Sequence, residues 1–216
     1  EAREQGLEHP ESAALPDMEA LRQAARHTDP NHIVLDEENM TVFFADPELK
    51  LDLGAVAKGY AVERVADTLT AQGATGIVLS IGGNVRTLGT RPDGGIFGIG
   101  VQNPDLASDI QHIAVLGLEN ASLVTSGSYQ RYYTVDGKAY HHIIDPDTLM
   151  PSEYAWAVSV VTEDSGLADA LSTALFTMSI EDGKALLTRY PGTEALWVEQ
   201  DGTIVYSDGL EQLLIK

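Results

Sequence analysis

The sequence predicts an α+β fold, in which β-hairpins and helices are interleaved and the sheets are antiparallel. Short runs rich in β-branched and aromatic residues recur along the chain, bounded by glycine or by Asp-Gly turns, which is typical of hairpins. Longer segments with a helical spacing of apolar residues lie between them. The order contains too few strand–helix–strand units for a parallel Rossmann-type sheet. With 216 residues, of which 44% are hydrophobic, the chain is expected to build one domain around one core.

The N-terminal region is expected to contain a connecting segment, one helix and one hairpin. Residues 1–16 are polar, contain two prolines and lack periodicity, so we expect a linker or a trimmed N-terminal connection, followed by a domain over residues 17–216. The pattern then predicts a helix from Asp17 to about His27. A hairpin should follow, in which the runs HIVLD and MTVFFA flank the turn DEEN.

The remainder of the chain is predicted to carry the longest helix, most of the strands and two further helices. A helical pattern runs from Gly54 to a terminating glycine at Gly73. Hairpin turns are expected at Asp136-Gly137 and at Asp201-Gly202. The other predicted strands are GIVLSIGG, NVRTLGT, IFGIGVQ, QHIAVLGL, ASLVTSG and WAVSVV, and the other predicted helices are LADALSTALFTM and IEDGKALLTRY.

Charge and cysteine usage exclude several classes of function. Lys and Arg total 13 against 33 Asp and Glu, which gives a formal net charge of -20. A field of this sign repels phosphate polymers, so we expect no nucleic-acid partner. The chain has no cysteine, which excludes a thiolate nucleophile and a zinc-thiolate site. No apolar stretch approaches the ~20 residues that a membrane-spanning helix needs.

The helix LADALSTALFTM offers a candidate metal site. Asp169 and Thr173 lie one turn apart, on the face opposite its large apolar residues, and their neighbours on that face are small. We therefore expect this face to point into the molecule, where the two side-chain oxygens would suit Mg²⁺ or Ca²⁺. The spacing alone favours a structural role, in which Asp169 stabilises the helix N-terminus and Thr173 bonds back to a carbonyl.

A lysine near the start of the long helix is the second candidate. Lys58 is spaced four, seven and eleven residues from Val62, Val65 and Leu69, so it is predicted to share the apolar stripe of this helix. A lysine in that position must find an anion or extend to solvent. Gly59 beside it would let another group approach the backbone closely.

Two loops and a histidine pair complete the candidates. Residues 80–86 and 125–133 place glycine, hydroxyl and amide side chains directly after predicted strands, which suits either a ligand cradle or ordinary turns. His141 and His142 should point to opposite faces of an alternating strand, so at most one can serve a given site. Asp145 could orient an imidazole or cap the next turn.

Five segments in order resemble those of the ApbE-type flavin transferases, a bacterial family of FAD:protein FMN transferases. They are LDLGAVAKGYAVERV, SIGGNV, TSGSYQRYY, HHIIDP and ADALSTALF, and the resemblance runs from about Asp36 to the C-terminus. It implies a T-fold-related architecture of antiparallel sheet layers with packed helices. It also implies that the family's N-terminal segment, which helps to cover the flavin, is missing here.

The resemblance implies an activity with two substrates. The protein would take FAD and a divalent cation, usually Mg²⁺, transfer the FMN half to a Ser or Thr hydroxyl of an acceptor flavoprotein, and release AMP. Acceptors of the family carry an Asp-x-x-Ser/Thr-Gly-Ala-Ser/Thr motif. An FAD-binding module without transfer and a Mg²⁺-dependent FAD pyrophosphatase remain alternatives. The implied location is extracytoplasmic, periplasmic or at the cell surface with a lipoprotein anchor, so that membrane contact would come only through an anchor or partner outside this chain.

Site residues follow from matching the motifs position by position. The metal ligands would be Asp169, Thr173 and the carbonyl oxygen of Ala55, and the histidine needed for transfer would be His142, with His141 structural. The residues expected to contact FAD are Lys58, Gly83, Asn84, Ser126, Gly127, Tyr129, Arg131 and Asp145.

Two positions depart from the family pattern. Leu149 stands where the family has glycine, so its turn is expected to be built differently. Gln130 replaces a carboxylate.

Overall fold

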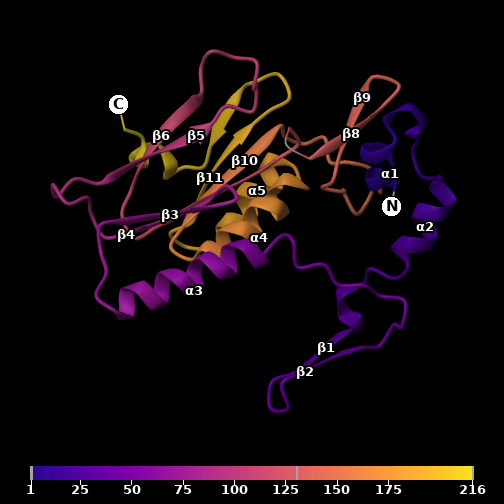
Figure 1. The fold of residues 1–216 in the computed structure, drawn as a ribbon, viewed down its shortest axis with the longest axis horizontal. Coiled ribbons are helices and arrows are strands. Elements are labelled where there is room, and N and C mark those ends of the chain that lie inside the picture. The colour runs from indigo at the N-terminus through magenta and orange to yellow at the C-terminus, as the bar shows by residue number, and fades with distance from the viewer. Residues whose placement is uncertain (1, 130, 216) are drawn as a thin grey trace. The chain divides into compact units, whose positions relative to one another are not determined.

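The structure is a computed structural model that describes residues 2–129 and 131–215. The chain divides into two compact units, which are described separately (Figure 1). Unit 1 consists of Glu1–Leu53 with Tyr132–Pro151, and unit 2 of Gly54–Arg131 with Ser152–Lys216. None of the helices in the described ranges is long and apolar enough to cross a bilayer.

Unit 2 is built on a six-stranded antiparallel sheet with the order β12-β11-β10-β7-β4-β3. The separate β5–β6 hairpin pairs only with itself among the described strands. The strands are β3 (Ile77–Ile81), β4 (Asn84–Leu88), β5 (Phe97–Gln102), β6 (His112–Leu118), β7 (Ser122–Gly127), β10 (Ala157–Thr162), β11 (Glu194–Val198) and β12 (Ile204–Tyr206). The helices are α3 (Ala57–Ala71), α4 (Ser165–Phe176) and α5 (Ile180–Leu187), with a 3-10 turn at Leu210–Leu213. The strands and helices predicted for this part of the sequence are therefore confirmed.

One face of the large sheet carries the main apolar core. Residues directly paired across antiparallel strands share a face, and alternate residues of one strand do too. Leu123 pairs with Val161, and Ala157 pairs with Val198, so these four residues lie on one face. They pack in a cluster with side chains from the β5–β6 hairpin and the C-terminal 3-10 turn, namely Val101, Leu116, Leu118 and Leu210.

The other face of the sheet is covered by α4, which in turn packs on α3 (Figure 1). Ser126 on β7 and Val158 on β10 are paired and point to this face. Because α4 contacts the sheet on one side and α3 on the other, each of its residues is buried or half-buried. The prediction that the Asp169 face of this helix points into the molecule is confirmed, since Asp169 is only 3% exposed.

The buried stripe of α3 differs from the predicted one. Its buried residues are Gly59, Val62, Glu63 and Ala66, which follow the i, i+3, i+4, i+7 spacing of one helix face. Val65, which the sequence analysis placed on the stripe, is 42% exposed. The predicted stripe was rotated by one residue, or about 100°.

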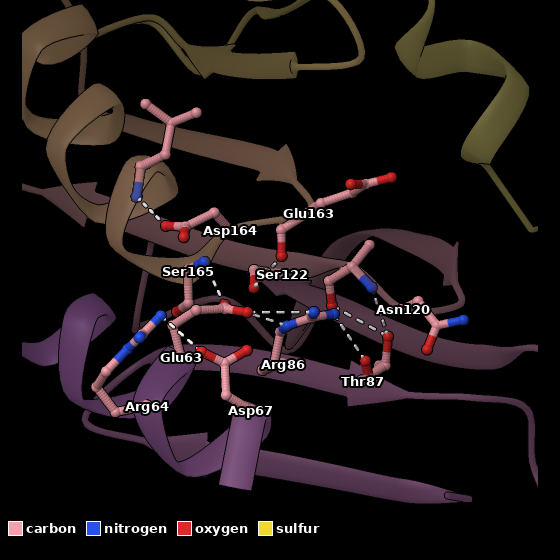
Figure 2. Close-up of polar contacts among 12 residues, drawn as sticks. Glu63, Arg64, Asp67, Arg86, Thr87, Asn120, Ser122, Glu163, Asp164 and Ser165 are labelled. Atoms are coloured by element: carbon pink, nitrogen blue, oxygen red, sulfur yellow. Dashed lines mark hydrogen bonds and ion pairs between the residues drawn. The ribbon is translucent and has the colours of Figure 1, made fainter. Parts of the chain in front are cut away.

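A buried ion pair joins α3 to the sheet and to the start of α4 (Figure 2). The Arg86 guanidinium on β4 donates through Nε and Nη2 to the two Glu63 oxygens, at 3.2 and 3.3 Å. The Ser165 amide, in the first turn of α4, donates to Glu63 Oε2 at 2.7 Å. Asp164, the N-cap of α4, accepts from Leu167 N at 2.7 Å. Glu63 thus fixes the position of the α4 N-terminus relative to α3.

Unit 1 consists of short helices and two hairpins. Its elements are α1 (Ala2–Glu8), α2 (Met18–Ala25), β1 (Ile33–Asp36) paired with β2 (Thr41–Phe44), and β8 (Tyr132–Val135) paired with β9 (Lys138–His141), with 3-10 turns at Pro10–Ser12 and Pro30–His32. The predicted helix and both predicted hairpins are confirmed. The β8–β9 turn has positive φ at Asp136 (48°) and Gly137 (80°), which suits its Asp-Gly sequence.

The first residues and the first hairpin show two features that the sequence analysis did not predict. Residues 2–8, expected within an unpatterned linker, form α1, because the segment is rich in good helix formers. Its Gly6 lies directly against the Tyr133 ring, where a Cβ atom would come within 2.6 Å. The β1–β2 hairpin exposes apolar side chains on both faces, namely those of Val34, Leu35, Val42 and Phe43.

Candidate functional site

The candidate site in unit 2 is centred on a buried carboxylate. Asp169 of α4 accepts hydrogen bonds from Lys58 Nζ of α3 at 3.0 Å (Oδ1) and 3.2 Å (Oδ2). The backbone amide of Gly59 donates to Oδ2 at 2.9 Å. Of the two outcomes expected for Lys58, an anion partner or extension to solvent, the structure shows an anion partner, and this is the predicted metal ligand itself.

Asp169 also caps the N-terminus of α3. The N-cap residue of this helix is Val56, whose side chain cannot accept a hydrogen bond, and Gly59 lies in the first turn. A carboxylate at this end is favoured by the partial positive charge of the helix terminus. The start of α3 and the middle of α4 are therefore held together by one charged group.

Gly59 makes this close contact possible. A Cβ atom at this position would lie 2.1 Å from the Ser165 carbonyl oxygen and 2.6 Å from Asp169 Cβ. Both contacts involve atoms close to the α4 backbone, so the two helices could not keep their separation. The prediction that glycine here permits close approach is confirmed.

Replacing Gly59 by alanine should lower the free energy of unfolding by about 3 kcal/mol, because α3 and α4 must move apart to accommodate the methyl group. Urea denaturation followed by circular dichroism measures this loss. The matched control is Gly73→Ala at the end of the same helix. Its φ is +76° and a Cβ there meets nothing within 4 Å, so it should cost only about 1 kcal/mol of left-handed strain. Equal losses in the two variants would contradict the role assigned to Gly59.

Hydroxyl groups of α4 and β7 form a hydrogen-bonded cluster that reaches the backbone carbonyl of Asp169. Thr173 Oγ1 shares a hydrogen bond of 3.2 Å with Ser126 Oγ of β7, and Ser126 Oγ shares one of 2.8 Å with Ser172 Oγ. Thr173 Oγ1 also donates to the Asp169 carbonyl oxygen at 3.4 Å, which is the back-bond of the structural alternative. The structure therefore brings Ser126, Thr173 and Asp169 together, with Ser172 as an additional member.

The first residue of β4 adds an unsatisfied side-chain amide to the same face of the sheet. Asn84 pairs with Val124, two residues from Ser126 on β7, so its side chain points to the α4 side. Asn84 is 1% exposed, and its Nδ2 has no hydrogen-bond partner among the described residues. Buried amide groups are rarely left unsatisfied, so this donor is suited to a ligand oxygen. The preceding Gly82 and Gly83 both have positive φ, and a Cβ on Gly82 would lie 3.5 Å from Lys58 Cδ.

The donor set around Asp169 fits a hard divalent cation only if a ligand brings further oxygens. Carboxylate and hydroxyl oxygens are what Mg²⁺ prefers. However, no group of three or more His, Cys, Asp or Glu side chains in the described part of the chain could hold a metal ion by itself. A phosphate ligand would supply both the missing oxygens and the missing negative charge. The carbonyl of Ala55 belongs to the exposed turn that precedes α3.

The other predicted site residues of unit 2 lie at the end of β7 and just after it. Gly127 lies against the Tyr129 ring, where a Cβ atom would come within 2.4 Å. Burial raises the pKa of the Tyr129 hydroxyl above its usual value of 10.0, so this phenol stays protonated in the neutral range. Arg131 is exposed. Gln130, where the sequence departs from the family pattern, lies outside the described residues.

The predicted histidines lie in unit 1, beside a pocket of about 530 Å³. His141 and His142 both line it, together with Tyr133, Tyr140 and mostly apolar residues of the same unit. β9 ends at His141 and the chain bends at His142, yet burial still alternates from residue 141 to 145, as expected for side chains on opposite faces. His141 is buried and its Nδ1 accepts from Ile143 N at 3.3 Å, which supports its structural role. His142 is exposed.

Asp145 and Leu149 shape the turn that follows these histidines. Asp145 is buried and its Oδ1 accepts from Asp147 N at 2.8 Å, so it caps the turn. Leu149 has φ of 60°, the left-handed conformation that glycine adopts without strain. This left-handed conformation costs a non-glycine residue about 1 kcal/mol, so the turn is strained at Leu149.

Glu63 and Ser172 were not among the site residues predicted from the sequence. Glu63 was overlooked because the predicted stripe of α3 was rotated, although its i+4 spacing from Gly59 was a usable signal. Ser172 is buried and also donates to the Asp169 carbonyl at 2.9 Å. A serine within a helix that lacks a charged face was the available signal.

Comparison with known proteins gives the family. The model of the ApbE family matches residues 5–197. The chain belongs to the ApbE family. The match begins upstream of Asp36, where the resemblance was first noted, so it includes most of unit 1. The predicted α+β class with antiparallel sheets and packed helices is confirmed.

Relatives of this ApbE-family chain carry consistent names. It is 36% identical over 195 residues to an FAD:protein FMN transferase of Klebsiella pneumoniae, which covers 90% of this chain and 60% of the relative. It is 33% identical to a protein of the same name from Treponema pallidum, covering 92% and 58%. The chain thus spans about 60% of the length of these two curated relatives.

Two crystal structures show the same fold. An ApbE protein of Thermotoga maritima is 34% identical, with a TM-score of 0.86 over 100% of this chain and 70% of that one. The apo form of the flavinyl transferase ApbE of Pseudomonas stutzeri is 30% identical, with a TM-score of 0.77 over 93% and 62%.

Proposed function

We propose that the protein transfers FMN from FAD to a Ser or Thr hydroxyl of an acceptor flavoprotein and releases AMP, with Mg²⁺ or another divalent cation bound at Asp169. The relatives that carry the name FAD:protein FMN transferase support the reaction. The observation in this structure that carries the proposal is the buried carboxylate of Asp169, with hydroxyl oxygens, a lysine and an unsatisfied amide donor in its surroundings.

The reaction exchanges a phosphoanhydride bond of FAD for a phosphoester bond to the acceptor. The acceptor hydroxyl oxygen forms a bond to the FMN phosphorus of FAD, the bond from that phosphorus to the bridging oxygen breaks, and AMP leaves with that oxygen. A cation held by Asp169, Thr173 and the Ala55 carbonyl would neutralise charge on the diphosphate. Lys58 would pair with a phosphate oxygen, and Asn84 Nδ2 would donate to another ligand oxygen.

The proton of the acceptor hydroxyl needs a base. His142 is the proposed group, because an imidazole has an ordinary pKa near ~6.5 and its ring in this protein is exposed beside a pocket. The buried His141 is already engaged with Ile143 N and is less suited to exchange protons with a substrate. An extracytoplasmic location, as in the resembling family, remains part of this proposal.

Intact-mass spectrometry of an acceptor tests the proposal. The protein, FAD and Mg²⁺ are incubated with an acceptor protein that carries the Asp-x-x-Ser/Thr-Gly-Ala-Ser/Thr motif, and small products are separated by chromatography. We expect the acceptor to gain one FMN and AMP to appear in equal amount. Free FMN with AMP, and no change in the acceptor, would instead indicate a pyrophosphatase. Bound FAD without any product would indicate a binding module.

A further inference from the structure

Lys58 occupies the carboxylate that a divalent cation would need. Its ammonium contacts both Asp169 oxygens, at 3.0 and 3.2 Å, and Oδ2 also accepts from the Gly59 amide. A carboxylate oxygen has two lone-pair sites, so Oδ2 has donors for both. A cation could use Oδ2 only after a donor leaves, and it would share Oδ1 with the ammonium.

Electrostatic repulsion opposes simultaneous binding of the Lys58 ammonium and a divalent cation to Asp169. Among the described residues, the Asp169 side chain accepts hydrogen bonds from one ammonium and one backbone amide, so the carboxylate's single negative charge is already balanced. A dication at the same carboxylate would stand within a few ångströms of the ammonium, where like charges repel strongly in a buried setting. The hydroxyls of Thr173 and Ser126 bring oxygens but no charge.

The Lys58 side chain has room to move away from Asp169. The Lys58 side chain is 37% exposed, whereas the side chain of Asp169 is only 4% exposed. Lys58 Cδ passes beside Gly82, which presents no side chain to restrict the ammonium. A diphosphate arriving at the β3–β4 turn would offer the ammonium a new anion and the cation new oxygen ligands at the same time.

We propose that Lys58 and the divalent cation compete for Asp169. We also propose that the FAD diphosphate relieves this competition by binding the Lys58 ammonium, which then leaves Asp169. The cation and FAD then bind as a coupled pair, and the cation alone binds weakly. The identity of the diphosphate rests on the proposed function, whereas the competition itself concerns only Lys58, Asp169 and the cation.

Binding of Mn²⁺ without FAD tests the competition directly. Mn²⁺ favours oxygen ligands as Mg²⁺ does, and the electron paramagnetic resonance signal of the free ion falls when it binds. We expect Lys58→Met, which keeps the length of the side chain but removes its charge, to bind Mn²⁺ at least tenfold more tightly than the unmodified protein. Lys58→Arg, which keeps the charge, should bind it no more tightly than the unmodified protein does.

Two further variants separate the local effect from general ones. Lys184→Met removes the same charge from the exposed surface of α5 and should change the Mn²⁺ affinity less than twofold, because a change in the overall field acts weakly. Adding Asp169→Asn to Lys58→Met should abolish the gain. Affinity equal to or weaker than that of the unmodified protein in Lys58→Met would overturn the proposal, as would an equal gain in Lys184→Met.

The coupling between FAD and the cation can be measured from the effect of each on the affinity of the other. In the unmodified protein FAD should tighten Mn²⁺ binding at least tenfold, and Mn²⁺ should tighten FAD binding by the same factor, as linkage requires. In Lys58→Met this factor should shrink, because no ammonium remains to be displaced. An unchanged factor would contradict the proposal. If Mn²⁺ responds as predicted but no acceptor is modified, the competition stands and the proposed transferase activity fails.

Discussion

Replacing Asp169 by asparagine should lower FMN transfer by at least about 100-fold, because the amide keeps the shape of the side chain but removes the only carboxylate proposed to hold the cation. The measurement is the kcat/KM for AMP release in the presence of FAD, Mg²⁺ and acceptor. Raising the Mg²⁺ concentration should not restore the rate.

The fold of the Asp169→Asn protein should survive. Its amide oxygen can still accept from Gly59 N, and the Lys58 side chain is exposed enough to reach water. The matched control is Asp164→Asn at the N-cap of the same helix, which should keep its transfer rate within about twofold, because asparagine caps helices as well as aspartate does. Undiminished transfer in Asp169→Asn would remove the metal site from the proposal.

Replacing His142 by alanine should also reduce transfer by at least about 100-fold, which is the usual contribution of a general base. FAD affinity, followed by the change in flavin fluorescence, should stay within about twofold. The two observations together separate a role in chemistry from one in binding. Transfer at the normal rate across the pH range would show that His142 does not take the proton.

The adjacent histidine gives the control for that experiment. His141→Ala removes a buried acceptor of the Ile143 amide, so it should lower the free energy of unfolding by about 1–3 kcal/mol. Its transfer rate, measured at a temperature where the variant is folded, should fall far less than that of His142→Ala. Equal losses in the two variants would indicate that the pocket, and not His142 itself, matters.

Local chemistry explains why most of the fold was predictable. The Asp136-Gly137 turn imposes positive φ on two successive residues, and that geometry fixes the β8–β9 hairpin regardless of what surrounds it. Asp17 caps α2 by accepting from Glu19 N and Ala20 N, so its start was equally visible in the sequence. The register of the β12-β11-β10-β7-β4-β3 sheet depends on pairings between distant segments and could not be predicted in this way.

The requirements of individual site residues could be predicted from the sequence, but the contacts between those residues could not. Lys58 in an apolar region implied an anion, and Asp169 among small residues implied a buried partner, but 111 positions separate them. No local pattern states that one satisfies the other. Glu63 was missed for a different reason. The predicted apolar stripe of α3 was wrong by one residue, so Glu63, which is buried and accepts from Ser165 N, was expected on the solvent side.

The position of α4 between the sheet and α3 limits how this region can change during evolution. A helix with one solvent-exposed face can accumulate neutral substitutions there, but no residue of α4 is exposed. Drift should therefore concentrate on the outer surface of α3 and in the loops, while the sequence of α4 changes only through compensated pairs of substitutions. Homologues that diverge strongly elsewhere would still share a small-residue helix at this place.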